Sequence, residues 1–218
     1  MNFMRSVLLG ICSIGFLVQP TAHKGGIELL LTGYFYPEEV TSPTGETWIG
    51  LFPKRDGYEA KQTQVRIFDS LCIDEPQRYV RANQPSEPIF LIRGSSRVHE
   101  GQVRTVFHGK MFLKPLQEIK FELSHKDPYE LSASRDNANY LLTLEQHDDY
   151  QLLMSQKLDE ENEPLVIWIG DLDDDNKLDF FIYTGPGTHG SEYALFLSSY
   201  AEHGKLVKKV ATFSVVGD

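Results

Sequence analysis

Basic residues and long apolar runs are scarce in this sequence, and each shortage excludes a class of protein. Lysine and arginine number 21 against 31 aspartate and glutamate residues, which gives a formal net charge of −10. Because binding to nucleic-acid phosphates depends on basic side chains that displace counterions, this balance excludes an electrostatically driven nucleic-acid binder. Beyond residue 22, no apolar run approaches the roughly 20 residues that a membrane-spanning helix needs, so we expect no integral membrane protein.

The first 22 residues have the pattern of a secretory signal peptide. Arg5 precedes the apolar run from Ser6 to Val18, and Ala22 places a small residue at a plausible cleavage point. We therefore expect residues 1–22 to be removed and residues 23–218 to be periplasmic or extracellular. The alternatives are a buried amino-terminal helix and a lipoprotein acylated at Cys12.

Cysteine is rare as well, with only two in the chain. Cleavage of residues 1–22 would remove Cys12 and leave Cys72 without an intramolecular partner. A chain of this length can bury a hydrophobic core without needing a disulfide. Because Cys72 lies among apolar neighbours, we expect it to be a small buried core residue.

Short runs rich in Ile, Val, Phe, Tyr and Thr recur along the chain, separated by clusters of Gly, Pro, Asn and Asp. This spacing favours antiparallel strands over a parallel sheet, which would need long helical crossovers. We predict an all-β fold, an antiparallel sandwich or barrel-like sheets, as a single domain over 23–218, with a subdivision near 125–137 as an alternative. The predicted strands are 27–36, 46–52, 63–69, 88–93, 103–113, 117–123, 139–145, 150–156, 164–170, 179–184, 193–199 and 206–215.

Two of these segments predict how their strands are buried. Ile119, Phe121 and Leu123 alternate with charged residues, which is the pattern of a half-buried strand. By contrast, the segment from Pro164 to Gly170 is apolar at every side chain. It is therefore predicted to be a central strand covered on both faces.

The most informative segment holds five aspartates within the nine residues 171–179, between two apolar strands. Carboxylates this close repel one another, and a bound divalent cation would remove that repulsion. Calcium takes six to eight oxygen ligands, and acids at alternate positions of a tight turn can converge on one centre. The segment therefore predicts a hairpin near the carboxyl terminus with Ca²⁺ at its tip.

The spacing also assigns the ligands. The predicted side-chain ligands are Asp171, Asp173, Asp175 and Asp179, and the main-chain carbonyl oxygen of Lys177 is the fifth protein ligand. Asp174 should point outward. Asn176 stands where calcium loops usually have glycine, and asparagine tolerates the positive φ that this position requires. The loop is not an EF-hand, because Ile182 occupies the position of the bidentate glutamate.

The segment from Gly170 to Ile182 resembles the FG-GAP/VCBS type of calcium motif, Asp-x-Asp-x-Asp-Gly-x-x-Asp followed by an apolar strand. This resemblance implies the same four aspartates and the same carbonyl oxygen as ligands. Proteins of that kind that form propellers repeat the motif in every blade, whereas it occurs once here, so no propeller is implied. The chain after Trp168 is also similar to the carboxyl-terminal part of uncharacterised secreted bacterial proteins that carry a single such loop.

No catalytic residue is assigned. The seven histidines show no metal-binding spacing, and no nucleophile elbow is present. Tyr34, Tyr36 and Trp48 are candidate contacts to a sugar. We predict a secreted calcium-binding module without catalytic activity, whose partner is an unknown protein or glycan. Two hypotheses stay open beside it: a secreted hydrolase with an unrecognised active site, and an assembly or adhesion subunit, which should show an unpaired edge strand.

Overall fold

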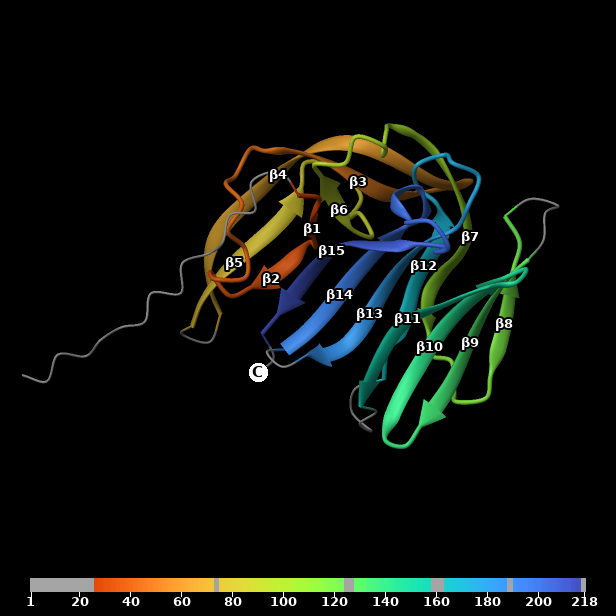
Figure 1. Cartoon of the computed structure of the whole chain (residues 1–218). Helices are drawn as coiled ribbons and strands as arrows, with labels where there is room; N and C mark the ends of the chain where they lie inside the picture. The colour runs from red at the N-terminus through yellow and green to blue at the C-terminus, as the bar shows by residue number, and fades with distance from the viewer. Residues whose placement is uncertain (1–25, 73–74, 124–127, 158–162, 188–189, 217–218) are drawn as a thin grey trace, which may run out of the picture.

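The computed structural model describes residues 26–72, 75–123, 128–157, 163–187 and 190–216 (Figure 1). The expected signal peptide, residues 1–22, lies outside them, as does the side chain of Cys72. Among the described residues, strands dominate and the helical structure is limited to a 3₁₀ turn, η1 (Ser198–Tyr200). The prediction of an all-β fold with antiparallel sheets is confirmed.

The larger sheet contains eleven strands and curls into a barrel-like shape (Figure 1). Its main path runs β1-β6-β3-β4-β7-β12-β13-β14-β15, and β5 and β2 extend it from β4. All of its ladders are antiparallel. β1 and β15, the two ends of the path, approach each other but are not paired, so the barrel is nearly closed. The strands of this sheet are β1 (Glu28–Leu30), β2 (Gly33–Phe35), β3 (Thr47–Lys54), β4 (Gly57–Cys72), β5 (Glu75–Ala82), β6 (Leu91–Arg93), β7 (Gly101–Met111), β12 (Leu165–Asp171), β13 (Asp179–Gly187), β14 (Gly190–Leu197) and β15 (Lys208–Val215).

A second, four-stranded sheet has the order β11-β10-β9-β8. Its strands are β8 (Glu118–Phe121), β9 (Tyr129–Asp136), β10 (Asn139–Gln146) and β11 (Asp149–Lys157). The chain leaves the larger sheet after β7, builds this sheet and returns at β12 (Figure 1). The range 125–137 of the alternative division includes β9, which pairs with both β8 and β10.

Strands β12, β13 and β14 form a wall between two hydrophobic cores. Trp168, Phe181 and Leu195 belong to the core inside the larger sheet. Their neighbours along the same strands, such as Ile169 and Phe180, belong to the core beneath the second sheet. Alternate side chains of a strand point to opposite faces, so a strand with apolar residues throughout can bury both. This confirms the prediction that the segment from Pro164 to Gly170 is a central strand covered on both faces.

Every predicted strand overlaps an observed one, but two observed strands were not predicted. β5 carries Pro76 and several charged residues, and its inward positions include Arg78, which donates to the main-chain oxygens of Pro37 and Val40. β9 alternates Tyr129, Leu131 and Ala133 inward, with Glu130 and Ser132 between them. Both strands were therefore missed, because the prediction relied on runs of apolar residues.

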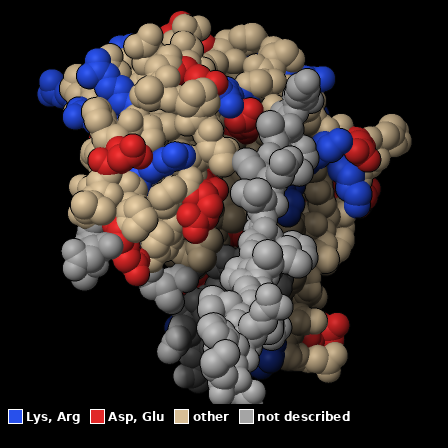
Figure 2. All heavy atoms as spheres, turned by 90° about the vertical axis from the view of Figure 1, so that its left-hand side faces the viewer, with Lys and Arg blue, Asp and Glu red and all other residues tan. Residues whose placement is uncertain are grey.

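Acidic and basic side chains are interspersed over the face shown in Figure 2. Many of the basic groups are neutralised locally, as in the pairs Lys54–Glu59 and Arg93–Glu28. Nowhere in the described part of the chain does a helix reach the length and hydrophobicity needed to cross a bilayer.

Gly170 places the strand β12 tightly against β7. A Cβ atom at this residue would collide with the main-chain oxygen of Arg104 and with the ring of Trp168. We therefore expect Gly170→Ala to lower the free energy of unfolding by about 1–3 kcal/mol, the usual cost of overpacking a filled site. Urea unfolding would measure this, and an unchanged midpoint would contradict the tight packing of β12 on β7.

Candidate metal centre

The aspartates lie in the hairpin that joins β12 to β13. Asp171 ends β12 and Asp179 begins β13, and Gly170 pairs with Asp179 across the ladder. Within the turn, Asp174 and Asn176 have φ values of 59° and 65°. Asparagine and aspartate adopt this left-handed conformation more readily than other side chains. The predicted hairpin near the carboxyl terminus is therefore confirmed, including the positive φ of Asn176.

Three of the carboxylates converge. One oxygen from each of Asp171, Asp173 and Asp179 lies within 4.8 Å of the other two. Asp179 is completely buried, and Asp171 is only 3% exposed. A buried charge is costly unless it is paired, hydrogen-bonded or bound to a metal. The partners of each carboxylate therefore decide what this group can do.

Asp179 connects three segments of the chain. Its Oδ2 accepts a hydrogen bond from the main-chain N–H of Leu172 at 2.7 Å. Its Oδ1 accepts from the N–H of Ser198 at 2.7 Å and from the Ser198 hydroxyl at 2.9 Å. The carboxylate thus ties the start of β13 to both the turn and η1.

Asp171 organises the turn itself. Its two oxygens accept the main-chain N–H groups of Asp175 and Asn176, each at 3.0 Å. Arg104, from the neighbouring strand β7, forms an ion pair with Asp171 and donates to the Asn176 side chain at 3.0 Å. One positive charge therefore offsets part of the negative charge of the group.

Asp173 is the carboxylate with one oxygen that accepts no hydrogen bond in the described structure. Its Oδ2 accepts a hydrogen bond from the Ser199 hydroxyl. Its Oδ1 is buried and has no hydrogen-bond partner in the described structure. An ionised carboxylate oxygen that is buried without a partner costs free energy. A cation bound to this oxygen would remove that cost.

The pKa values reflect the same crowding. Burial raises the pKa of the Asp179 carboxyl well above its usual 3.8, and the charge of Asp173 raises it further. Hydrogen bonds from Ser198 and Leu172 oppose this effect only in part. Burial is also the largest cause of the raised pKa values of Asp171 and Asp173, to which Asp175 adds repulsion. Without a cation, ionising these carboxyls is therefore less favourable than ionising an aspartate in water.

The predicted ligands are not all brought together. Asp175 lies outside the group of three. Its carboxylate accepts from the N–H of Lys177 at 2.9 Å and lies 3.0 Å from the Ser198 hydroxyl, whose single proton is shared between Asp175 and Asp179. Lys177 is exposed, and no described contact places its carbonyl oxygen in the group. Asp174 points outward as predicted, with a side chain that is 94% exposed. Asp171, Asp173 and Asp179 are the residues that could hold a metal ion.

Sequence reasoning missed Ser198, Ser199 and Arg104. The two serines were predicted to continue the strand 193–199, whereas β14 ends at Leu197 and η1 begins at Ser198. Their polar side chains directly after an apolar strand are the signal that could have indicated a turn. Arg104 lies 67 residues from Asp171 in the chain, and only the pairing of β7 with β12 brings them together.

Comparison with family models, curated proteins and solved structures found no match to this chain.

The raised pKa of Asp179 predicts how stability depends on pH when chelator keeps the protein metal-free. Between about pH 4 and the raised pKa, the folded state holds more protons than the unfolded state, so the free energy of unfolding falls as pH rises. The stabilisation is complete below the ordinary pKa and is lost as pH rises through the folded-state pKa. Urea unfolding at several pH values would measure the slope.

The variant Asp179→Asn should reduce the slope of stability against pH, because it removes a fully buried carboxyl whose pKa is raised. At acidic pH it should be less stable than the parent, since its amide N–H₂ faces a main-chain donor, whereas at higher pH the loss of the buried charge offsets this cost. Equal slopes in both proteins would show that Asp179 does not cause the pH dependence.

Proposed function

We propose that the loop Asp171–Asp179 binds a structural Ca²⁺ ion in a secreted binding protein that has no catalytic activity. The observation that carries this proposal is the convergence of three carboxylates, one of which has a buried oxygen, Asp173 Oδ1, without a hydrogen-bond partner among the described residues. A cation supplies the missing partner and removes the repulsion between Asp171, Asp173 and Asp179.

The donor set supports calcium as the ion. All three converging side chains offer carboxylate oxygens, which are ligands for hard cations such as Ca²⁺, Mg²⁺ and Mn²⁺. Calcium accepts irregular shells of six to eight oxygens, whereas magnesium requires a near-ideal octahedron. In the FG-GAP/VCBS-like assignment, Asp175 and the carbonyl oxygen of Lys177 complete the protein ligands, and water supplies the rest. Asp175 then exchanges its contact with Ser198 for the ion.

The ion would act by fixing how the hairpin is attached to η1. Asp173 and Asp179 already accept hydrogen bonds from Ser199 and Ser198. A cation between these carboxylates keeps them ionised, and ionised acceptors form stronger hydrogen bonds than protonated ones. Binding therefore strengthens the contact between the β12–β13 turn and the segment that follows β14.

The contacts of the carboxylates support a structural rather than a catalytic role. Both oxygens of Asp179 accept hydrogen bonds from the protein, and a general acid or base needs an oxygen that reaches the substrate. The signal-like segment 1–22 supports export. Outside the cell, calcium modules function with dissociation constants of about 10⁻⁴ to 10⁻³ M, so a loop without the bidentate glutamate can still be filled.

Thermal unfolding with and without calcium tests the proposal. At a Ca²⁺ concentration about 50 times the dissociation constant, binding to the folded state alone should add about 2 kcal/mol. For a chain of this size, the midpoint should rise by about 5–9 °C relative to chelator. An unchanged midpoint, with no heat of binding in calorimetry, would refute the calcium site.

A matched pair of variants assigns the effect to the buried carboxylates. Asp173→Asn should remove most of the calcium-induced stabilisation, and it should make the metal-free protein more stable than the parent because one repelling charge is lost. Asp174→Asn removes a charge from the same turn at an outward-pointing side chain, so it should keep the calcium effect. Equal losses in both variants would indicate general electrostatic attraction to the acidic turn.

A further inference from the structure

Two large aromatic side chains are exposed on the outer face of β2, β5 and β4. Tyr34 of β2 is 59% exposed, and Phe68 of β4 is 47% exposed. Tyr79 of β5 lies between them, because it pairs with Tyr34 on one side and with Phe68 on the other. The inward residues of the same strands, such as Val65 and Val80, are buried in the core of the larger sheet. The three residues therefore form an aromatic row across the outer face, on the side of the molecule away from the second sheet (Figure 1).

Packing within the protein explains only part of this aromatic row. The rings of Tyr34 and Tyr79 are in contact, with centroids 4.7 Å apart. Such cross-strand pairs stabilise a sheet. Phe68 makes no ring contact in the described structure, although half of its apolar side chain faces water. Large apolar side chains that gather on a surface are typical of a binding site.

Two arginines lie beside the aromatic row on the same face. Arg66 of β4 and Arg81 of β5 are directly opposite each other, two residues along their strands from the row. Both are exposed, and no described contact pairs either guanidinium with an acid. By contrast, Arg93 pairs with Glu28 at 2.6 Å. Like charges in directly opposite positions destabilise a sheet, so an anionic ligand on this face would remove a repulsion.

Amide side chains continue the same face beyond the arginines. Gln64 and Asn83 are both exposed, and the main-chain N–H of Asn83 donates to the main-chain oxygen of Gln64 at 2.9 Å. Glu75 lies at the opposite end of β5 from Arg81, and it accepts a hydrogen bond from the Tyr36 hydroxyl at 3.0 Å. Rings, positive charge and amides therefore lie together at one end of the face, and this acid lies at the other.

The arrangement is complementary to a sugar chain that carries carboxylates. Neighbouring strands are about 4.8 Å apart, so Tyr34 and Phe68, on either side of β5, are about 10 Å apart, which is close to the length of two linked pyranose rings. The C–H face of a pyranose is apolar and packs on an aromatic ring, whereas a sugar carboxylate accepts from guanidinium groups. Amide groups bond to sugar hydroxyls.

The charge of the whole chain favours a ligand with widely spaced carboxylates. Single-stranded nucleic acid also stacks on aromatic rings, but it carries a negative charge on every phosphate. The formal net charge of −10 opposes such a ligand more than a sugar chain that is charged at every second ring.

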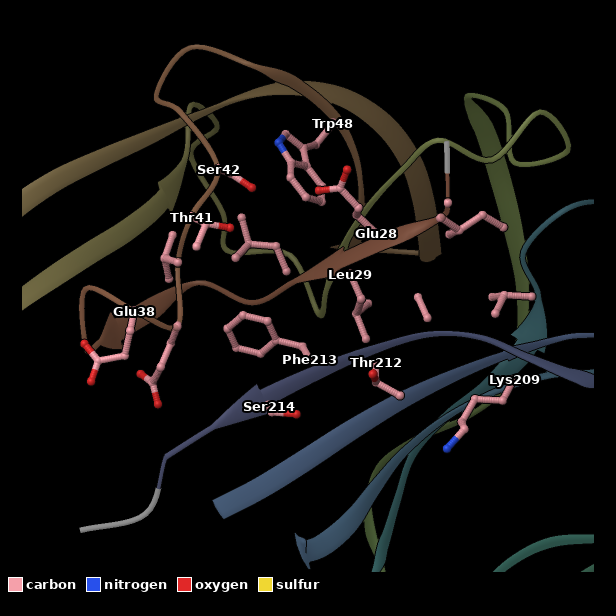
Figure 3. A pocket seen from close by; sticks show the side chains of 17 residues that line it. Glu28, Leu29, Glu38, Thr41, Ser42, Trp48, Lys209, Thr212, Phe213 and Ser214 are labelled. Carbon is pink, nitrogen blue, oxygen red and sulfur yellow. The ribbon is translucent and has the colours of Figure 1, made fainter. Parts of the chain in front are cut away.

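The three aromatic residues that the sequence offered as sugar contacts separate in the structure. Tyr34 belongs to the aromatic row. Tyr36 is half-buried, and its hydroxyl donates to Glu75. Trp48 is only 2% exposed, and Figure 3 shows it among the side chains that line a cavity beside β1 and β15. Trp48 is therefore too buried to pack against a sugar.

We propose that the outer face of β2, β5 and β4 binds a polysaccharide in which neutral and carboxylated sugars alternate. Tyr34 and Phe68 pack against pyranose rings, and Arg66 and Arg81 donate to a carboxylate between them. This face shares no residue with the calcium loop, so either proposal can fail without the other.

Nuclear magnetic resonance titration of the main-chain amides tests this proposal. The probe is a hexasaccharide of alternating glucuronate and N-acetylglucosamine, added with chelator present so that calcium bridges no carboxylates. It should shift amides of β2, β5 and β4. Phe68→Ala should weaken binding about five- to tenfold, and Arg81→Gln about tenfold.

Matched control variants lie elsewhere on the surface. Tyr150→Ala removes a ring from β11 that is 58% exposed, and Arg55→Gln removes an exposed guanidinium from the turn between β3 and β4. Both controls should keep the affinity of the parent. Equal losses in the controls and in Phe68→Ala and Arg81→Gln would overturn the proposal, as would the absence of amide shifts at millimolar hexasaccharide.

Three altered ligands separate recognition of an acidic sugar from other modes of binding. The hexasaccharide with methyl-esterified carboxylates should bind at least tenfold more weakly, and equal binding would contradict the role of the arginines. A peptide of about six glutamates should not bind this face, and equal binding would indicate general electrostatic attraction instead. Tighter binding of a thymidine oligonucleotide would identify the face as a site for single-stranded nucleic acid and would also overturn the proposal.

Discussion

Repulsion between buried carboxylates is the constraint around which the carboxyl-terminal hairpin is organised. Asp171, Asp173 and Asp179 place oxygens within 4.8 Å of one another, and two of them have almost no exposure to water. Donors from separate parts of the chain surround them: Arg104 from β7, main-chain N–H groups of the turn, and Ser198 and Ser199 from η1. These donors offset only part of the cost of ionisation, because burial first, and repulsion between the carboxylates second, keeps the pKa values of all three carboxyls raised.

The wall of β12, β13 and β14 explains why the chain can hold such a group. Both faces of these strands are covered by apolar cores, so the ends of the strands are fixed from two sides. Burying this much apolar surface contributes favourable free energy, which offsets the cost of burying the charged carboxylates. The register of β12 on β7 also brings Arg104 beside Asp171, and Gly170 permits that close approach.

The sequence predicted what depends on local pattern and missed what depends on distant contacts. Alternating or continuous apolar residues identified most strands, and the spacing of the aspartates identified the hairpin and the outward direction of Asp174. β5 was missed because its inward Arg78 bonds to main-chain oxygens of a distant loop. Ser198 and Arg104 were missed because only sheet topology brings them to the aspartates, and the position of Asp175 depends on Ser198.

The converging aspartates lack positive charge more than hydrogen-bond donors. Main-chain N–H groups reach both oxygens of Asp171 and of Asp179, and the Ser199 hydroxyl donates to Asp173. Arg104 adds one positive charge, and in the described contacts it pairs with Asp171. A further neutral donor would satisfy Asp173 Oδ1 but would leave three neighbouring carboxylates to ionise in a largely buried place. A small cation can contact several oxygens that lie within 4.8 Å of one another and also reduces their charge, so the group could hold a metal ion.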